Sequence, residues 1–370
     1  MGDVGHTRVN EITVEDLPAL VAGSSLLCSA AGDASFDGYC EIVAELLRNR
    51  GSVRLVELDS MPDDALCAAI GVMGGFAPMV ELPPSGDEAV LAVRALEDRL
   101  GRKLDALVAL NAAGPNAVFA VAAAAVLDLP LVNCDGMGRV LPLISQTTYA
   151  LDGMPIGPLS AVSLAGDVLV LDSGLHRSDL LLRATMQAAG GWMLCAMYPA
   201  TVSRLRTAAI PHATSRVLEV GRHLTSATER GALLDGLARA VGARVVGSGR
   251  IVELGHATRT IGPRHYPAVP TSVVVQEYAD TGRMIRLEGQ SELLVAVIDG
   301  VVAAAVPDVL CLIDRHDLRV VGVETVAVGD HVDVLVVPAD ARWHSKAGLT
   351  LAGPRAFGFP VRHPREEAQR

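Results

Sequence analysis

The chain has 370 residues, of which half are hydrophobic but only 3% aromatic, so Ala, Val and Leu must form most of the core. This length favours more than one domain. A net charge of −11, with no basic cluster among aromatic residues, argues against nucleic-acid binding. No apolar run is long enough to span a bilayer, and no secretion signal is visible. The six cysteines are scattered without a CxxC pair, which predicts reduced thiols and a cytoplasmic protein.

The N-terminal segment begins with helix and loop signals. A helix is predicted from Thr13, with two acidic residues in its first turn. The small-residue stretch SSLLCSAAGDASFDGY then predicts a loop between a strand and a helix. It keeps one glycine where a phosphate-binding loop needs several, so a structural turn is favoured over a nucleotide site. Further on, Ser85 and Glu88 have the capping-box spacing that opens a helix reaching about residue 101.

The centre of the first 160 residues reads as strand, helix and strand, at residues 105–110, 117–127 and 131–132. Two buried parallel strands joined by a helix are the unit of an open α/β sheet, which binds ligands beyond the carboxyl ends of its strands. Polar side chains follow both strands, and we predict the site there. These residues are Asn111, Asn116, Asn133, Asp135 and Arg139.

The remaining chain changes character twice. Residues 161–242 predict an α+β segment that contains a hairpin, a strand and several helices. Residues 243–370 alternate Val, Ile and Leu with turn signals such as DTG and DG, which is typical of a small barrel or sandwich. The predicted fold class is therefore α/β with two domains. Residues 1–160 form an open, largely parallel α/β domain that carries the active site, and a β-rich domain follows the inserted α+β segment.

Several stretches, in the same order, make the sequence similar to a known family. They are NCDGMGRVLPLISQTTYALDGMP, MYPATVSRLRTAAIPHATSRVLEVGR, GQSELLVAVIDGVVAAAVPDVLCLID and AGPRAFGFPVRH. Together they resemble the S-methyl thiohydantoin desulfurase-like family (DUF917) over nearly the whole chain. The resemblance implies a two-domain α/β protein whose substrates are small cyclic ureides or thiohydantoins. It also implies a genomic association with hydantoinase- and oxoprolinase-type enzymes.

The motifs transfer residue by residue, with two departures. Residues 135–139 match the family's DGMGR, and Gln146, Thr147 and Thr148 match the polar run after it. Gln290 and Glu292 keep part of a QNEN-like run, while Pro307–Asp308 and residues 353–358 match PD and GPRAFG. The family's glycine-rich first loop is replaced by residues 29–33, where each added Cβ blocks positive φ angles. A glutamate of the family is Leu143 here, so the chain is a divergent member whose chemistry is altered or lost.

Hydrolysis of a thiohydantoin ring requires an activated water, a base and donors for the developing negative charge. Asp135 is the first choice for the base or a metal ligand, and Arg139 for the donor. Each has an alternative, because Asp135 followed by glycine is ordinary turn chemistry and Arg139 can pair with it structurally. Asn111 and Asn116 can hold a ring edge, although Asn111 can also cap the next helix.

The predicted site comprises ten residues. The catalytic candidates are Asp135, Arg139 and Glu81, the last a carboxylate flanked by apolar residues. The substrate-binding candidates are Ser29, Asp33, Asn111, Asn116, Gln146, Thr147 and Glu292. The ten histidines show no HxH or HExxH spacing, so a divalent metal such as zinc would need ligands from distant segments. Cys28 and Cys134 are alternative nucleophiles, although buried cysteines are more often core residues.

These observations favour an enzyme that acts hydrolytically on a C–S or C–N bond of a small cyclic amide, ureide or thiohydantoin-like ring. Two alternatives remain open at this point. The chain can be a non-catalytic partner subunit of a hydantoinase- or oxoprolinase-like complex, or a small-molecule binding protein that uses the same crevice. We expect a homo-oligomer or a hydantoinase-like partner.

Overall fold

The computed structural model describes residues 10–29, 37–74, 76–256, 271–278, 282–290, 292–323 and 325–368. The chain divides into two compact units. The first comprises Met1–Val21, Ala34–Gly138 and Leu143–Leu218, and the second comprises Ala22–Asp33, Arg139–Pro142 and Glu219–Arg370. In the described residues, the chain passes between the units within α1 (Leu17–Leu27), on both sides of Arg139–Pro142, and within α9 (Ala213–Ser226).

The first unit contains a sheet whose described strands run in the order β1-β2-β5-β4-β3-β8-β6-β7, with β9 paired to β5. Strands β2, β5, β4 and β3 are mutually parallel, and the outer pairs are antiparallel. The strands are β1 (Glu11–Ile12), β2 (Val53–Val56), β3 (Leu66–Gly74), β4 (Ala106–Ala109), β5 (Leu131–Asp135), β6 (Leu159–Val162), β7 (Val168–Leu171), β8 (Trp192–Thr201) and β9 (Ile210–Pro211).

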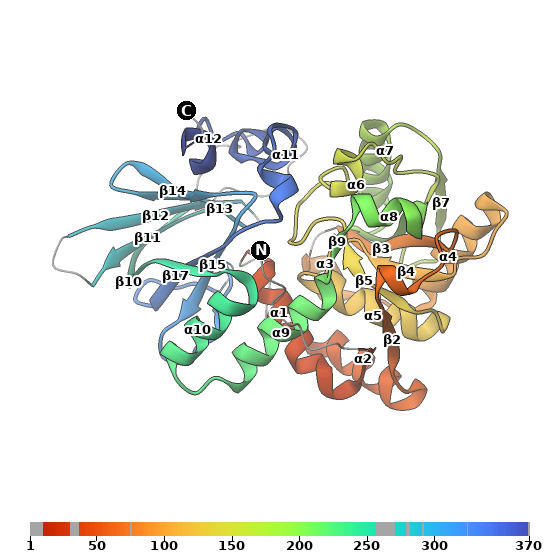
Figure 1. The fold of residues 1–370 in the computed structure, drawn as a ribbon, viewed down its shortest axis with the longest axis horizontal. Coiled ribbons are helices and arrows are strands. Elements are labelled where there is room, and N and C mark those ends of the chain that lie inside the picture. Colours follow the sequence, from red (N-terminus) through yellow and green to blue (C-terminus); the bar gives the residue numbers. More distant parts are fainter. Residues whose placement is uncertain are drawn as a thin grey trace. The chain divides into compact units, whose positions relative to one another are not determined.

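Helices lie on both faces of this sheet, and Figure 1 shows α2 and α5 on one side with α7 and α8 on the other. The Ala-rich α5 (Pro115–Leu127) packs closely against β3 and β4 because its small side chains let the backbones approach. Pro115 suits the first helical position, where its missing N–H is not needed. The other helices are η1 (Val14–Asp16), α2 (Asp37–Arg50), η3 (Leu58–Ser60), α3 (Phe76–Glu81), α4 (Asp87–Leu100), α6 (Thr148–Leu151), α7 (Leu175–Ala188) and α8 (Val202–Ala208).

The second unit is built on an antiparallel sheet in the order β14-β13-β12-β11-β10-β17-β15-β16. Its inward-facing Val, Ile and Leu side chains form one core, which alternation along the strands predicts. The strands are β10 (Arg244–His256), β11 (Thr271–Glu277), β12 (Met284–Gly289), β13 (Leu293–Ile298), β14 (Val301–Ala305), β15 (Val309–Asp314), β16 (Val320–Val321) and β17 (His331–Val337). The helices are α10 (Arg230–Val241), η4 (Ala341–His344), α11 (Lys346–Ala352), η5 (Pro354–Phe357) and α12 (Pro364–Ala368).

The predicted fold class is confirmed: a sheet with a parallel centre and helices is joined to a separate antiparallel sheet. The predicted 161–242 segment supplies β7 and β8 to the first sheet and α10 to the second unit. One local prediction is wrong, because residues 24–27 continue α1 as a helix and no strand precedes the loop at Ser29. The apolar, unbranched character of SSLLC allowed either structure.

Other local predictions hold. The Glu88 carboxylate accepts hydrogen bonds from the backbone N–H groups of Ser85 and Gly86, so its role is capping. All six cysteines are thiols, and five of them are buried. Within the described ranges, the longest apolar helices fall short of what a membrane crossing needs.

Candidate functional site

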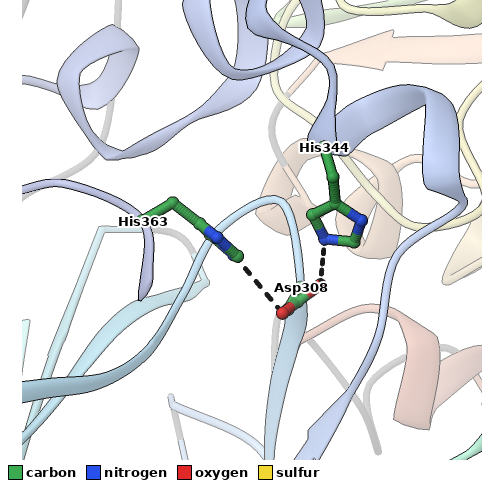
Figure 2. A group of neighbouring side chains, drawn as sticks. All are labelled: Asp308, His344 and His363. Carbon is green, nitrogen blue, oxygen red and sulfur yellow. Dashed lines mark hydrogen bonds and ion pairs between the residues drawn. The ribbon is translucent and has the colours of Figure 1, made fainter. Parts of the chain in front are cut away.

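Three ionisable side chains from distant parts of the sequence meet in the second unit: Asp308, His344 and His363. Nε2 of His344 lies 2.7 Å from Oδ1 of Asp308, and Nε2 of His363 lies 3.3 Å from Oδ2. In Figure 2 the two imidazole rings approach the carboxylate from different directions, His363 from the upper left and His344 from above. The three side chains are 9%, 6% and 1% exposed, respectively, so the cluster is almost fully enclosed.

Asp308 lies in the turn between β14 and β15, after Val306–Pro307. Besides the two imidazoles, its Oδ1 accepts a hydrogen bond from the backbone N–H of Ala339 at 2.9 Å. Burial alone would raise the pKa of this carboxyl group, but the hydrogen bonds from His344, His363 and Ala339 outweigh it and hold the pKa well below its usual range. Asp308 is therefore an anion at neutral pH.

His344 ends the short helix η4, whose position is fixed at both ends. The Asp340 side chain caps it by accepting from the backbone N–H of Arg342, and Ser345 caps α11 directly after it. Trp343 is fully buried, which anchors the turn and limits how His344 can be oriented. Nδ1 of His344 is buried and has no hydrogen-bond partner in the part of the chain that the structure describes.

His363 directly precedes α12, where Pro364 begins the helix. The Glu366 carboxylate accepts from the backbone N–H of His363, in the reciprocal half of a capping box. The backbone N–H of Arg365 donates to Nδ1 of His363 at 3.2 Å. With Nδ1 acting as an acceptor, the proton of a neutral His363 ring is on Nε2, which lies 3.3 Å from Oδ2 of Asp308.

Arg139 lies on the backbone of the same turn. Its Nη1 donates to the carbonyl oxygens of Pro307 and Asp308, at 3.1 and 2.7 Å. The side chain is buried, and Nη2 has no hydrogen-bond partner among the described residues. Burial lowers the pKa of Arg139, while the nearby carboxylates Glu292 and Asp308 act in the opposite direction. The arginine of DGMGR therefore carries a buried donor and binds the backbone of the turn that holds Asp308.

Two further predicted residues belong to this unit. Glu292 is buried and contributes negative charge near Arg139. The Ser29 hydroxyl lies within hydrogen-bonding distance of the carbonyl oxygens of Leu293 and Leu310, at 2.9 and 2.7 Å, which joins the loop to β13 and β15. Ser29 has a φ of +58°, so a residue with a Cβ adopts a positive φ here, contrary to the expectation for this loop. Asp33 lies outside the described residues.

Asp135, the first choice for the base, belongs to the first unit. Its buried carboxylate accepts hydrogen bonds from the backbone N–H groups of Ala112 at 2.8 Å, Gly138 at 2.9 Å and Met137 at 3.2 Å. Burial raises its pKa, although these three bonds oppose the shift. The contacts supply a structural role for Asp135, and a catalytic role stays a prediction.

Steric constraints explain why glycine follows Asp135 at two positions of the turn. A Cβ on Gly136 would lie 2.5 Å from the Tyr149 ring, and Gly138 has a φ of +71°. The DGMG turn therefore requires glycine at both positions to wrap the carboxylate in N–H groups. The alternative ion pair between Asp135 and Arg139 does not appear in the structure, where Arg139 binds backbone carbonyl groups instead.

Most of the other predicted residues of the first unit form hydrogen bonds with nearby backbone groups or side chains. Asn116 accepts from the backbone N–H of Val72, and Thr147 caps α6 through Ala150. Gln146 accepts from the backbone N–H of Leu143, and Asn111 is buried with its Nδ2 against the Met137 sulfur. Glu81 is exposed at the end of α3. Their roles in binding or catalysis stay predictions.

The Asp308 cluster offers two nitrogen donors and one carboxylate oxygen, with the ligand atoms all within 4.8 Å of one another. Such a set can hold a divalent metal, or it can activate water through an imidazole oriented by a carboxylate. Sequence reasoning did not assemble it, because 36 and 19 residues separate its members. The available signals were the PD and GPRAFG motifs, which place Asp308 and the His363 segment in matched regions.

The comparisons with known proteins agree with this architecture. Residues 15–173 match the family model described as S-Me-THD-like, N-terminal domain, and residues 174–365 match S-Me-THD-like, C-terminal domain. A crystal structure of a protein from Chromobacterium violaceum aligns with a TM-score of 0.77 and 21% identity, over 98% of this chain and 97% of the other. At that identity the likeness shows a shared fold. No curated protein matches the chain. Because the two family models together cover nearly all of it, the chain belongs to the S-Me-THD-like family, that of the S-methyl thiohydantoin desulfurase-like proteins.

Proposed function

We propose that the protein hydrolyses a small cyclic amide, ureide or thiohydantoin-like ring at the cluster of Asp308, His344 and His363. Family membership supports the substrate class. The observation that carries the proposal is the buried Asp308 carboxylate with two imidazoles against it, and the Arg139 guanidinium bound to the backbone carbonyl group of the same residue. An enclosed carboxylate and imidazole pair is the arrangement that raises the basicity of a nitrogen toward water.

The reaction needs an activated nucleophile, because a ring carbon between two nitrogens is a poor electrophile. In the proposed step, water loses a proton to the cluster as its oxygen bonds to the ring carbon. The C–S or C–N bond then breaks, and the leaving thiol or amine takes the proton. For an S-methyl thiohydantoin, the products are the hydantoin and methanethiol.

Arg139 is suited to the charge that develops during this attack. Its Nη1 is fixed by two carbonyl groups, while Nη2 remains a donor without a hydrogen-bond partner in the described ranges. A buried guanidinium held in place stabilises an oxyanion or a substrate carboxylate without reorganisation. Glu292 would limit the net positive charge at this position.

The test is turnover of a panel of hydantoins and S-methyl thiohydantoins, followed by mass spectrometry of the ring product. Wild-type protein should convert at least one compound, and His344→Ala should lower kcat/KM by about 100-fold or more, since general-base catalysis contributes that much. His316→Ala is the matched control, because His316 is exposed in a turn of the same unit. Equal activity of the two variants would refute the assignment.

The same experiment separates the other functions. Stabilisation of the protein by a ring compound without turnover would favour a binding protein. Absence of both effects, together with co-purification of a hydantoinase-like chain, would favour a partner subunit. The expected cytoplasmic location and self-association stay predictions.

A further inference from the structure

The side chains of Asp308, His344 and His363 form a set that resembles a three-ligand metal centre, and we propose that they bind a single divalent transition-metal ion, with Zn²⁺ as the expected occupant. This inference concerns the same site and rests on the proposed function for its purpose, but metal binding can be measured without substrate.

The types of donor atom in the cluster favour a transition metal. Two imidazole nitrogens and one carboxylate oxygen suit zinc and its neighbours, whereas calcium and magnesium prefer oxygen ligands only. Three protein ligands are also the usual number in catalytic zinc sites, where the fourth position holds water or substrate. One histidine is enough to form an ion pair with a buried carboxylate. The second histidine next to Asp308 is therefore the feature that favours a metal site.

The distances between the donor atoms are close to those of a tetrahedral zinc site. Ligand atoms around a tetrahedral zinc ion lie roughly 3.3 Å apart, given bond lengths of about 2.0–2.1 Å. His363 Nε2 and Asp308 Oδ2 already lie 3.3 Å apart, while His344 Nε2 lies 2.7 Å from Oδ1 and has to move outward slightly. All three donors lie within 4.8 Å of one another, which is about 1.5 Å more than that spacing at most.

Contacts with neighbouring residues hold each of the three side chains or its backbone in place. The backbone N–H of Ala339 fixes Asp308, the buried Trp343 fixes the segment that carries His344, and the Glu366 cap fixes the His363 backbone. Such supporting contacts orient metal ligands in known sites. Arg139, through the Asp308 carbonyl group, adds a further constraint on the same turn.

Metal binding would change which nitrogen carries the proton in each imidazole ring of the cluster. Without metal, Nε2 of His344 donates its proton to the carboxylate, and Nε2 of His363, which lies 3.3 Å from Oδ2, carries the proton of a neutral ring. A metal takes these Nε2 lone pairs, so each neutral ring must carry its proton on Nδ1 instead. When bound, the metal would supply the activation of water that an imidazole supplies without it. Nδ1 of His344 has no described hydrogen-bond partner, but Nδ1 of His363 faces the N–H of Arg365. Metal binding should therefore change the contact between His363 and the first turn of α12.

Calorimetry and metal analysis of the full chain test the proposal, with Zn²⁺ and Co²⁺ as the probes. Wild-type protein, stripped with a chelator and dialysed, should bind one Zn²⁺ per chain. Cobalt should give the visible absorption of a site with nitrogen and oxygen ligands. His344→Ala and His363→Ala should each weaken binding by about tenfold or more, as loss of a ligand or its support does. His316→Ala should bind like wild type.

The outcomes are separable from those of the activity assay. Zinc bound at one per chain in wild type and lost in both histidine variants, with no turnover of any ring, would support the metal site and refute the proposed function. Full turnover by the stripped protein would refute a catalytic metal and leave the function in place. Unchanged stoichiometry in the double variant His344→Ala/His363→Ala, or no binding by folded wild type, would overturn the metal site.

Discussion

Replacement of Asp333 by asparagine should destabilise the second unit strongly and in a pH-dependent way. Asp333 lies on β17, and its side chain is fully buried. It accepts from Arg230 at 2.6 and 2.8 Å, from Arg315 at 2.9 Å and from Ser248 at 2.6 Å. Asparagine keeps the shape of the carboxylate but removes its charge and turns one acceptor oxygen into a donor.

The magnitude follows from the partners' exposure. Breaking a buried ion pair costs about 3–5 kcal/mol when the remaining charge stays buried. Here the arginine side chains are 36% and 29% exposed, so water can solvate them after the substitution. We therefore expect the free energy of unfolding to fall by about 2 kcal/mol, near the value of one hydrogen bond to a charged group.

The pH dependence has a definite sign. Burial would raise the pKa of Asp333, but the hydrogen bonds from Arg230 and Ser248 and the two arginine charges lower it overall. A carboxyl group whose pKa is lowered in the folded state stabilises the protein above its unfolded pKa of about 3.9, and this contribution is lost as the pH falls through the folded value. The difference between wild type and variant should be constant from pH 8 to about 5 and shrink below about 4.

Urea unfolding followed by circular dichroism measures this difference, with Asp299→Asn as the control. Asp299 is 66% exposed and lies 3.8 Å from Arg283, so its loss should change the free energy of unfolding by less than about 0.5 kcal/mol. Asparagine also tolerates the positive φ of that turn. An equal effect of the two substitutions, or a difference as large at pH 3 as at pH 5, would refute the reasoning.

Three other substitutions test contacts at the predicted site. Asp135→Asn should lower the free energy of unfolding by about 1–2 kcal/mol, because an amide nitrogen would face backbone N–H groups, and leave zinc stoichiometry unchanged; a loss of zinc would contradict a structural role. Ser29→Ala removes the hydroxyl that joins the loop to β13 and β15, so urea unfolding should show a loss of about 1–2 kcal/mol. Arg139→Lys should lower kcat/KM with the ring substrates, because an ammonium group cannot hold both carbonyl groups of the turn and still present a fixed donor. Unchanged kinetics would remove Arg139 from the proposed mechanism.

Much of the fold followed from local patterns. The strand-helix-strand unit at residues 105–132 was readable because a buried parallel strand is a short apolar run that ends in polar residues. Alternation in the last third predicted the antiparallel sheet. The end of α1 was missed, because SSLLC carries no period that separates a buried helix from a buried strand. The pairing of β8 with β3 was also out of reach, since long-range antiparallel pairing leaves no local signal.

The site was predicted less well than the fold, for a related reason. Polar residues after the strands of the first sheet were visible in sequence, and their hydrogen bonds in the structure are mostly with nearby backbone groups. The residues that form the cluster stand in turns and beside short helices, where sequence patterns report capping more readily than chemistry. Asp308 and His363 were visible only as parts of family motifs, and His344 had no signal of its own.

The DGMGR motif is divided between the two units, and this division explains the different roles of its residues. Its first four residues build a turn in the first unit, in which the Asp135 carboxylate is surrounded by N–H groups and glycine is required at two positions. Its last residue, Arg139, belongs to the second unit and holds the turn that carries Asp308. A carboxylate saturated by backbone donors is poorly suited to accept a proton from water, whereas a carboxylate held by two imidazoles orients groups that can. The motif would then contribute to function through its arginine, and its aspartate would serve the fold that presents it.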